Sequence, residues 1–362
     1  MKHIGLYVHV PFCASRCPYC DFYTERAGES VRSDFISALK RDVLAWSEKD
    51  DFCADTVYFG GGTPSVLPGD ALAEILRLIK DRFHVPDSAE ITVECNPSSD
   101  LETFLPAVTA AGVNRISLGM QSAVDNERKL LGRKADRKRV EECIALARRC
   151  GEDNISLDIM LGVPEQTEES LEETLQFCID TGVPHLSSYM LKLEEGTNFY
   201  KRRDKLELPS EDTTVGFYEK TAAVLKAAGY QHYEISNFAK PGYEGRHNLK
   251  YWRCGEYLGL GPAAHSYLDG KRFYTEPDLT AYLDKEMISD EGTGGDFEER
   301  LMLALRLSEG FSEELPSTVM EELKKPYMAK YTNYDGKTLR LTEEGFLVSN
   351  SVISQLLASL NN

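Results

Sequence analysis

The chain has 362 residues, of which 42% are hydrophobic, and its formal net charge is −18 at pH 7. This size and composition predict a folded protein of about two domains and exclude a disordered chain. The acidity argues against nucleic acid as a partner, because nucleic-acid binders normally present a basic surface to the phosphates.

The start of the chain carries no recognisable targeting segment. Met1 leads directly into a short alternating strand, without the long apolar stretch of a signal peptide. No run of about 18 apolar residues predicts a transmembrane segment. Six of the nine cysteines are scattered and are typical of small, reduced, hydrophobic side chains. We therefore expect a cytoplasmic protein in a reducing compartment.

Short apolar runs alternate with segments of helical period over the first two thirds of the chain, which predicts repeated βα units. The predicted strands are 5–10, 56–59, 90–94, 115–118, 156–160 and 185–191. The predicted helices are 31–47, 70–82, 102–111, 136–150, 171–180 and 211–228. We predict an α/β fold, an open (β/α)6 partial TIM barrel whose functional residues lie on the loops after the carboxyl ends of the strands.

The barrel pattern is lost towards the carboxyl end of the chain. Residues 297–307 and 313–323 are predicted as helices, and 338–357 are typical of the end of a winged-helix module. We predict a core at 1–235, a connecting segment at 236–291 and a small, mainly α, winged-helix-like domain at 292–362. The last part carries little positive charge, so we interpret it as a lid or a partner-docking domain.

Three cysteines on one short loop form the most specific motif of the chain. Cys13, Cys17 and Cys20 follow the first predicted strand with the spacing C-x3-C-x2-C. Three thiolates can hold three irons of a [4Fe–4S] cube, which leaves the fourth iron open to a substrate or cofactor. The alternative is a zinc site with His9 or His3 as the fourth ligand. Structural zinc usually uses two separated ligand pairs, and the sequence has no second pair.

Other polar and glycine residues follow the later strands of the predicted barrel. Gly61 and Gly62 lack a Cβ atom and let the main chain approach a ligand closely. Arg133 carries a fixed charge suited to a carboxylate, and Asp158 stands at a strand end where it can accept from hydroxyl groups. Taken alone, Arg133 is more typical of a surface charge and Asp158 of a helix-capping residue.

The order of these motifs resembles the radical S-adenosylmethionine (SAM) superfamily. Within it, the chain resembles the branch of coproporphyrinogen III dehydrogenases and HemW-type haem chaperones. The segments that carry the resemblance are LYVHVPFC (6–13), GGGTPS (60–65), ECNP (94–97), SLGMQS (117–122), LGR (131–133), DIMLGVP (158–164) and YEISN (233–237). Each segment is weak by itself, but their order along the chain is specific.

The resemblance implies the radical SAM type of barrel, a [4Fe–4S] cluster on the three cysteines and SAM on its open iron. It assigns Gly61, Gly62 and Thr63 to the methionine amino end of SAM, Arg133 to its carboxylate and Asp158 to its ribose. The remaining implied cofactor contacts are Tyr7, Tyr19, Glu94 and Gln121.

Three features favour the haem chaperones over the dehydrogenases. The dehydrogenases have a further cysteine two residues after the third ligand, where this chain has Phe22, and they have a longer N-terminal extension. The segment HNLKYW (247–252) also matches the H-N-x-x-Y motif of the HemW-type chaperones. The resemblance therefore implies a haem chaperone, with an oxygen-independent coproporphyrinogen III oxidase as the alternative.

The H-N-x-x-Y motif contains a candidate haem ligand. Neutral imidazole is a common axial ligand of haem iron, so we predict that His247 binds haem, and His265 is a second candidate. The implied partners are haem, haem-accepting proteins and an electron donor to the cluster.

Overall fold

The computed structural model describes residues 1–285 and 287–360. Its main element is a sheet in which twelve strands follow the order β12-β11-β10-β9-β1-β2-β3-β4-β5-β6-β8-β7. The six central strands β1 to β6 are parallel, as predicted. They are β1 (Lys2–Val10), β2 (Phe52–Gly61), β3 (Glu90–Cys95), β4 (Arg115–Gln121), β5 (Ile155–Leu161) and β6 (His185–Met190). The sheet is open, because β1 and β6 pair with further strands instead of with each other.

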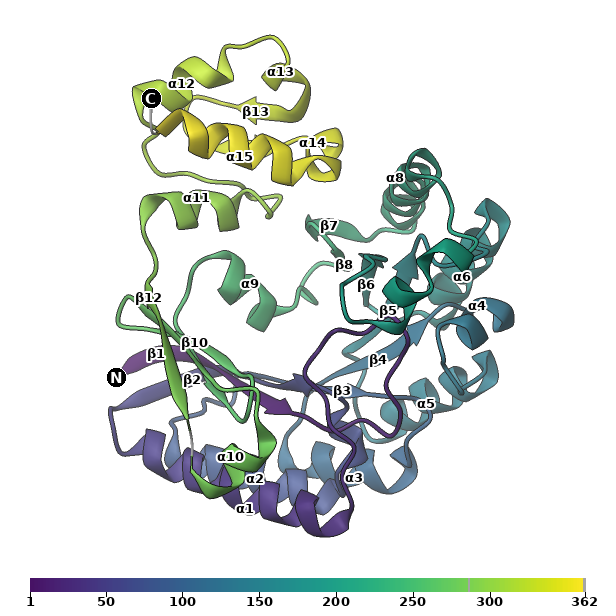
Figure 1. Cartoon of the computed structure of the whole chain (residues 1–362), viewed down its shortest axis with the longest axis vertical. Helices are drawn as coiled ribbons and strands as arrows, with labels where there is room; N and C mark the ends of the chain where they lie inside the picture. The colour runs from purple at the N-terminus through teal and green to yellow at the C-terminus, as the bar shows by residue number, and fades with distance from the viewer. Residues whose placement is uncertain (286, 361–362) are drawn as a thin grey trace.

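Helices cover the outer face of this curved sheet (Figure 1). All six predicted helices are confirmed, with ends that differ by at most three residues. They are α1 (Glu29–Ser47), α2 (Gly69–Arg82), α3 (Leu101–Ala111), α5 (Arg137–Arg149), α6 (Glu168–Thr181) and α8 (Glu211–Ala227). The short elements η1 (Pro64–Val66), α4 (Asp125–Leu130), α7 (Asn198–Lys201) and η2 (Arg203–Lys205) lie in the loops between them.

Alternation along β1 separates the apolar core from the functional side of the sheet. Leu6 and Val8 are fully buried in the apolar core, which also contains Phe35 of α1. Because successive side chains of a strand point to opposite faces, Tyr7 and His9 point to the inner face. Along β1, the inner face therefore carries polar and aromatic side chains, and the outer face carries aliphatic ones.

Residues 231–293, which include the predicted connecting segment, add strands to both edges of the sheet. β7 (Gln231–Glu234) and β8 (Asn237–Ala239) lie beside β6, and α9 (Arg246–Trp252) follows them. β9 (Tyr257–Leu260) is parallel to β1, and β10 (His265–Leu268), β11 (Lys271–Thr275) and β12 (Ile288–Thr293) extend that edge, with α10 (Leu279–Asp284) between them. The sequence did not predict these strands, because they are short and lack a clear apolar alternation.

The C-terminal part is mainly helical and lies at one end of the molecule (Figure 1). It contains α11 (Phe297–Ala304), α12 (Ser317–Leu323), α13 (Met328–Tyr331), β13 (Thr332–Tyr334), β14 (Leu339–Leu341), α14 (Glu343–Leu347) and α15 (Ser349–Leu360). The helix predicted from residue 313 begins only at Ser317, since Pro316 disfavours a helical residue before it. Two backbone bonds tie this part to β7, from Ile235 N to Arg306 O and from Ser308 N to Tyr233 O. The division at residue 292 stays a prediction.

In the described part of the chain, no helix is both long and apolar enough to cross a membrane.

Candidate functional site

A cavity of about 440 Å³ opens at the carboxyl ends of the central strands. Eleven of the thirteen predicted site residues line it: Cys13, Cys17, Tyr19, Cys20, Gly61, Gly62, Thr63, Glu94, Gln121, Arg133 and Asp158. Tyr7 and His247 do not line it. The structure thus brings together side chains from the cysteine loop and from the ends of β2, β3, β4 and β5.

The three cysteines of the loop line one wall of this cavity as partly exposed free thiols. Cys13 Sγ lies 3.3 Å from the Thr63 hydroxyl, and Arg133 donates to Cys17 Sγ at 3.7 Å. Within residues 1–285 and 287–360, no three His, Cys, Asp or Glu side chains are arranged around a common metal position. The donor set fits three irons of a cube, since each thiolate then binds a different iron.

Protonation of the thiols opposes metal binding in the metal-free loop. Burial raises the pKa of both Cys13 and Cys20. Metal ligation requires the thiolate and therefore releases these protons. The nearby Arg133 cation lowers the pKa of Cys13 and so partly offsets the effect of burial.

The alternative zinc ligands are placed elsewhere. The Nε2 of His9 donates to the Tyr23 carbonyl, so its Nδ1 accepts from the Tyr7 hydroxyl, both at 3.1 Å. Burial lowers the pKa of His9 to about 4 and keeps the ring neutral. His3 stands near the opposite end of β1 from the cysteine loop.

Glycines allow the loop after β2 to pack against the cysteine loop. A Cβ atom on Gly61 would lie 2.5 Å from Nδ1 of His9, and one on Gly62 would lie 2.6 Å from the Phe12 carbonyl. Gly61 also has a φ of 102°, which disfavours other residues. The backbone of Gly62 and Thr63 donates to Val10 and Phe12. These glycines thus hold the cysteine loop in place, a role that the motif alone did not reveal.

Two carboxylic acids form the polar floor of the cavity. The Tyr58 hydroxyl donates to Glu94 Oε1 at 2.7 Å, and burial raises the pKa of Glu94 to about 7. Ser117 donates to Asp158 at 3.0 Å, and burial also raises the pKa of Asp158. Burial removes water from these two carboxyl groups. A cationic or hydroxyl-bearing ligand would replace that water and is therefore favoured.

Gln121 and Arg133 line the cavity next to the end of β4. Gln121 has a left-handed φ of 74° and follows a bulge between β4 and β5. A positive φ at a residue other than glycine is uncommon and marks a functional position. Arg133 donates to the Gly119 carbonyl, which keeps the guanidinium beside Cys17. Tyr19 also lines the cavity and packs against Phe199.

His247 lies inside the barrel, away from this cavity. It is 1% exposed, and its Nδ1 and Nε2 form hydrogen bonds with Thr56 Oγ1 (2.9 Å) and the Tyr251 hydroxyl (2.7 Å). Its ring stacks on Tyr58 at 5.2 Å, and Tyr7 lies next to it. Both ring nitrogens are engaged, so ligation of haem iron requires these bonds to open. The haem role of His247 stays a prediction.

His265 is more accessible than His247. It is exposed on β10, stacks on Tyr274, and its Nδ1 lies 3.0 Å from Glu291 Oε2. Its role as a second haem ligand also stays a prediction.

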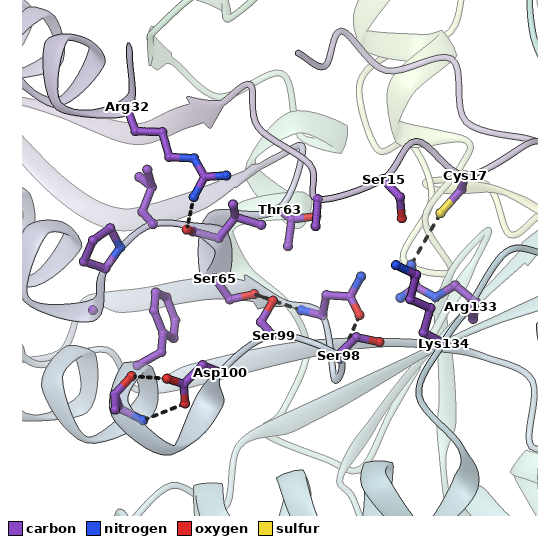
Figure 2. A pocket seen from close by; sticks show the side chains of 18 of the residues that line it. Ser15, Cys17, Arg32, Thr63, Ser65, Ser98, Ser99, Asp100, Arg133 and Lys134 are labelled. Carbon is purple, nitrogen blue, oxygen red and sulfur yellow. Dashed lines mark hydrogen bonds between the residues drawn. The ribbon is translucent and has the colours of Figure 1, made fainter. Parts of the chain in front are cut away.

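A second cavity of about 540 Å³ lies on the other side of the cysteine loop. The residues that it shares with the first cavity are Ser15, Cys17, Thr63, Asn96 and Arg133. Figure 2 shows Arg32 and Lys134 on opposite sides of it. The cysteine loop therefore separates two cavities, and Cys17 faces both.

Sequence reasoning missed the rim of the first cavity. Tyr189, Met190 and Lys192 line it from the end of β6, and Arg16 and Phe22 line it from the cysteine loop. The rule that functional residues follow the strand ends could have found the residues after β6, but no motif marked them.

Comparison with known proteins identifies the family. A family model described as the radical SAM superfamily matches residues 7–178. The chain is 35% identical to the haem chaperone HemW of Mycobacterium tuberculosis over 368 residues, which cover 98% of this chain and 94% of the relative. It is 38% identical to the haem chaperone HemW of Escherichia coli over 275 residues, which cover 74% of this chain and 72% of the relative.

A solved structure confirms the fold. The coproporphyrinogen III oxidase HemN of Escherichia coli matches with a TM-score of 0.85 over 98% of this chain and 90% of that chain, at 21% identity. At this identity the likeness concerns the architecture alone. The similarity to the HemW proteins along nearly the whole chain, together with the family model, shows that the chain belongs to the radical SAM superfamily and, within it, to the HemW family.

Proposed function

We propose that the chain is a haem chaperone, which binds haem together with a SAM-coordinated [4Fe–4S] cluster and transfers the haem to acceptor proteins. The observation that carries this proposal is the similarity to HemW proteins over nearly the full length, with the H-N-x-x-Y motif intact. We further propose that a separate protein donates electrons to the cluster and that the chain works in the cytoplasm.

The cavity at the strand ends is the proposed cofactor site. Cys13, Cys17 and Cys20 would hold the cluster, which, when bound, supplies the electron for reductive cleavage of SAM. The Glu94 carboxylate suits the ammonium group of SAM, while Asp158 accepts from hydroxyl groups.

The other predicted cofactor contacts bind or shield the same ligand. Arg133 offers a fixed cation to its carboxylate. Backbone groups around the ligand come from Gly61, Gly62 and Thr63, and a side-chain amide comes from Gln121. Tyr19 excludes water from the cavity.

His247 remains the proposed axial haem ligand. Burial lowers the pKa of His247 to about 3, so the imidazole is neutral and suited to iron once it is released. Release requires α9 to shift, because the bonds to Thr56 and Tyr251 hold the ring inside the barrel.

Haem titration under anaerobic conditions tests this proposal. The wild-type chain should give a saturable Soret band at about one equivalent of haem, because one axial ligand implies one site. His247→Ala should shift the band and weaken binding at least tenfold, while the iron content of the cluster stays unchanged. Absence of haem binding by the wild type would overturn the proposal, and an unchanged spectrum of His247→Ala would exclude His247 as the ligand.

A further inference from the structure

Three large apolar side chains lie exposed around the mouth of the cluster cavity. Phe22 is 64% exposed, Tyr189 43% and Met190 45%, and all three line this cavity. Nine large hydrophobic side chains are exposed within the described residues, so a third of them gather at one opening. Exposed apolar surface concentrated at a cavity marks a binding site.

The three side chains come from two separate segments of the chain that line the same cavity. Phe22 follows the last cysteine of the loop, whereas Tyr189 and Met190 end β6. Below them, Tyr19 and Leu191 belong to a small apolar cluster with Met160. The mouth is therefore apolar at its rim and polar at its floor.

The polar end of Tyr189 is buried near the Asp158 carboxylate, and this burial raises its pKa. Tyr189 lines the cavity while 43% of its surface stays exposed. An aromatic ring with an exposed surface is suited to stacking on a flat ligand.

We infer that the macrocycle of haem docks on Phe22, Tyr189 and Met190 at the mouth of the cluster cavity. This inference rests on the proposed function, since it presupposes that the chain binds haem. The docking site lies at the carboxyl ends of the strands and takes up haem while His247 is still enclosed in the barrel. His247 would become the axial ligand of the same haem only after α9 has shifted. The cavity of about 440 Å³ is assigned to the cluster and SAM, so the haem lies on its rim.

Charges around the rim match the two carboxylates of haem. Arg16 is exposed and donates from Nε to the Cys20 carbonyl at 3.3 Å, which leaves its terminal N–H groups for a propionate. Lys192 is also exposed and pairs with Glu194 at 2.6 Å, an exposed pair that a propionate can replace at little cost. The carboxylates of Asp21 and Glu194 repel propionates elsewhere on the rim, which leaves the positions next to Arg16 and Lys192.

Met190 also offers a ligand to the haem iron. A thioether is one of the side chains that ligate haem iron in proteins, and Met190 is exposed without any rearrangement of the fold. A thioether binds less strongly than an imidazole, which suits a site from which haem must leave.

Haem titration of rim variants tests this inference in the full-length chain with its cluster reconstituted. The double variant Phe22→Ser/Met190→Ala should weaken haem binding at least tenfold. Met190→His should tighten binding and shift the Soret band, because imidazole replaces the thioether. Met287→Ala is the matched control, since Met287 is 50% exposed but does not line the cavity, and its affinity should equal that of the wild type.

The outcomes separate this inference from the proposed function. A wild type that binds no haem overturns the proposed function and the inference with it. A wild type that binds haem while the double variant keeps its affinity within twofold overturns the inference alone, as does Met190→His with an unchanged spectrum. Normal haem affinity of the double variant combined with lost transfer to an acceptor protein also overturns it and assigns the rim to protein docking. Iron content, measured for each variant, controls for damage to the cysteine loop.

Discussion

Several ionisable side chains of the cluster cavity are buried, and burial shifts their pKa values. Burial raises the pKa of the Cys13 thiol and raises that of Glu94 to about 7. Burial thus favours the neutral form of each group, and a ligand of opposite charge favours the ionised form. The same effect occurs away from the cavity at Glu234, where burial raises the pKa to about 7.

Replacement of Cys13, Cys17 or Cys20 by Ala should abolish the cluster. A cube with only two protein ligands is not retained, so iron and sulfide content should fall from about four of each per chain to near zero after anaerobic reconstitution. Cys53→Ala and Cys178→Ala are the controls, because both thiols are buried outside the cavity. Full iron content in two of the three loop variants would contradict the assignment.

Glu234→Gln should change how stability depends on pH. The folded pKa of about 7 exceeds the usual 4.5, so the stabilising contribution of the protonated acid is present below pH 4.5 and is lost as the pH rises to about 7. The variant should therefore match the wild type near pH 4.5 and be more stable at pH 8, by on the order of 3 kcal/mol. Urea denaturation at both pH values measures the difference in free energy of unfolding between the variant and the wild type. A difference that does not depend on pH would argue against a raised pKa of Glu234.

At the scale of elements, α9 is fixed by a residue of a distant strand. Glu90, the first residue of β3, accepts hydrogen bonds from the backbone of Arg246 and His247 at 2.8 and 2.9 Å. A carboxylate at the first turn of a helix also interacts favourably with the helix dipole. One buried side chain thus determines where the H-N-x-x-Y motif lies in the barrel.

Glu90→Gln should weaken this attachment. The variant keeps the size of the side chain but loses the charge and one acceptor, so the free energy of unfolding should fall by about 1–2 kcal/mol. Glu298→Gln, on the exposed first turn of α11, should change it by less than about 0.5 kcal/mol. Chemical denaturation measures both, and equal effects of the two variants would show that Glu90 does not anchor α9.

At the scale of the whole molecule, the architecture is shared with an enzyme of porphyrin chemistry. The match to HemN extends over 98% of this chain, but at 21% identity it concerns the fold alone. The chain has Phe22 where the dehydrogenases have a further cysteine. Because this chain and HemN share the fold, the residues around the cavity determine which reaction, if any, each protein carries out.

The reconstituted chain should not turn over coproporphyrinogen III. With SAM and a reductant, we expect no protoporphyrinogen IX above background, because this porphyrinogen is not the proposed ligand. Chromatography of anaerobic reactions measures the product, with HemN of Escherichia coli as the positive control. Sustained decarboxylation over many turnovers would favour the alternative of a coproporphyrinogen III oxidase.

The sequence by itself determined the order of the βα units and the proposed cluster ligands. Three cysteines within eight residues need no tertiary structure to lie together, and the alternation of apolar runs follows from the periods of strands and helices. Tertiary structure decided the place of His247, whose partners Glu90 and Thr56 lie 157 and 191 positions away. Tertiary structure also placed Phe22 and Met190 at the same cavity, the one that contains the three cysteines. Such contacts depend on how distant elements pack, and the local pattern of residues carries no information about that packing.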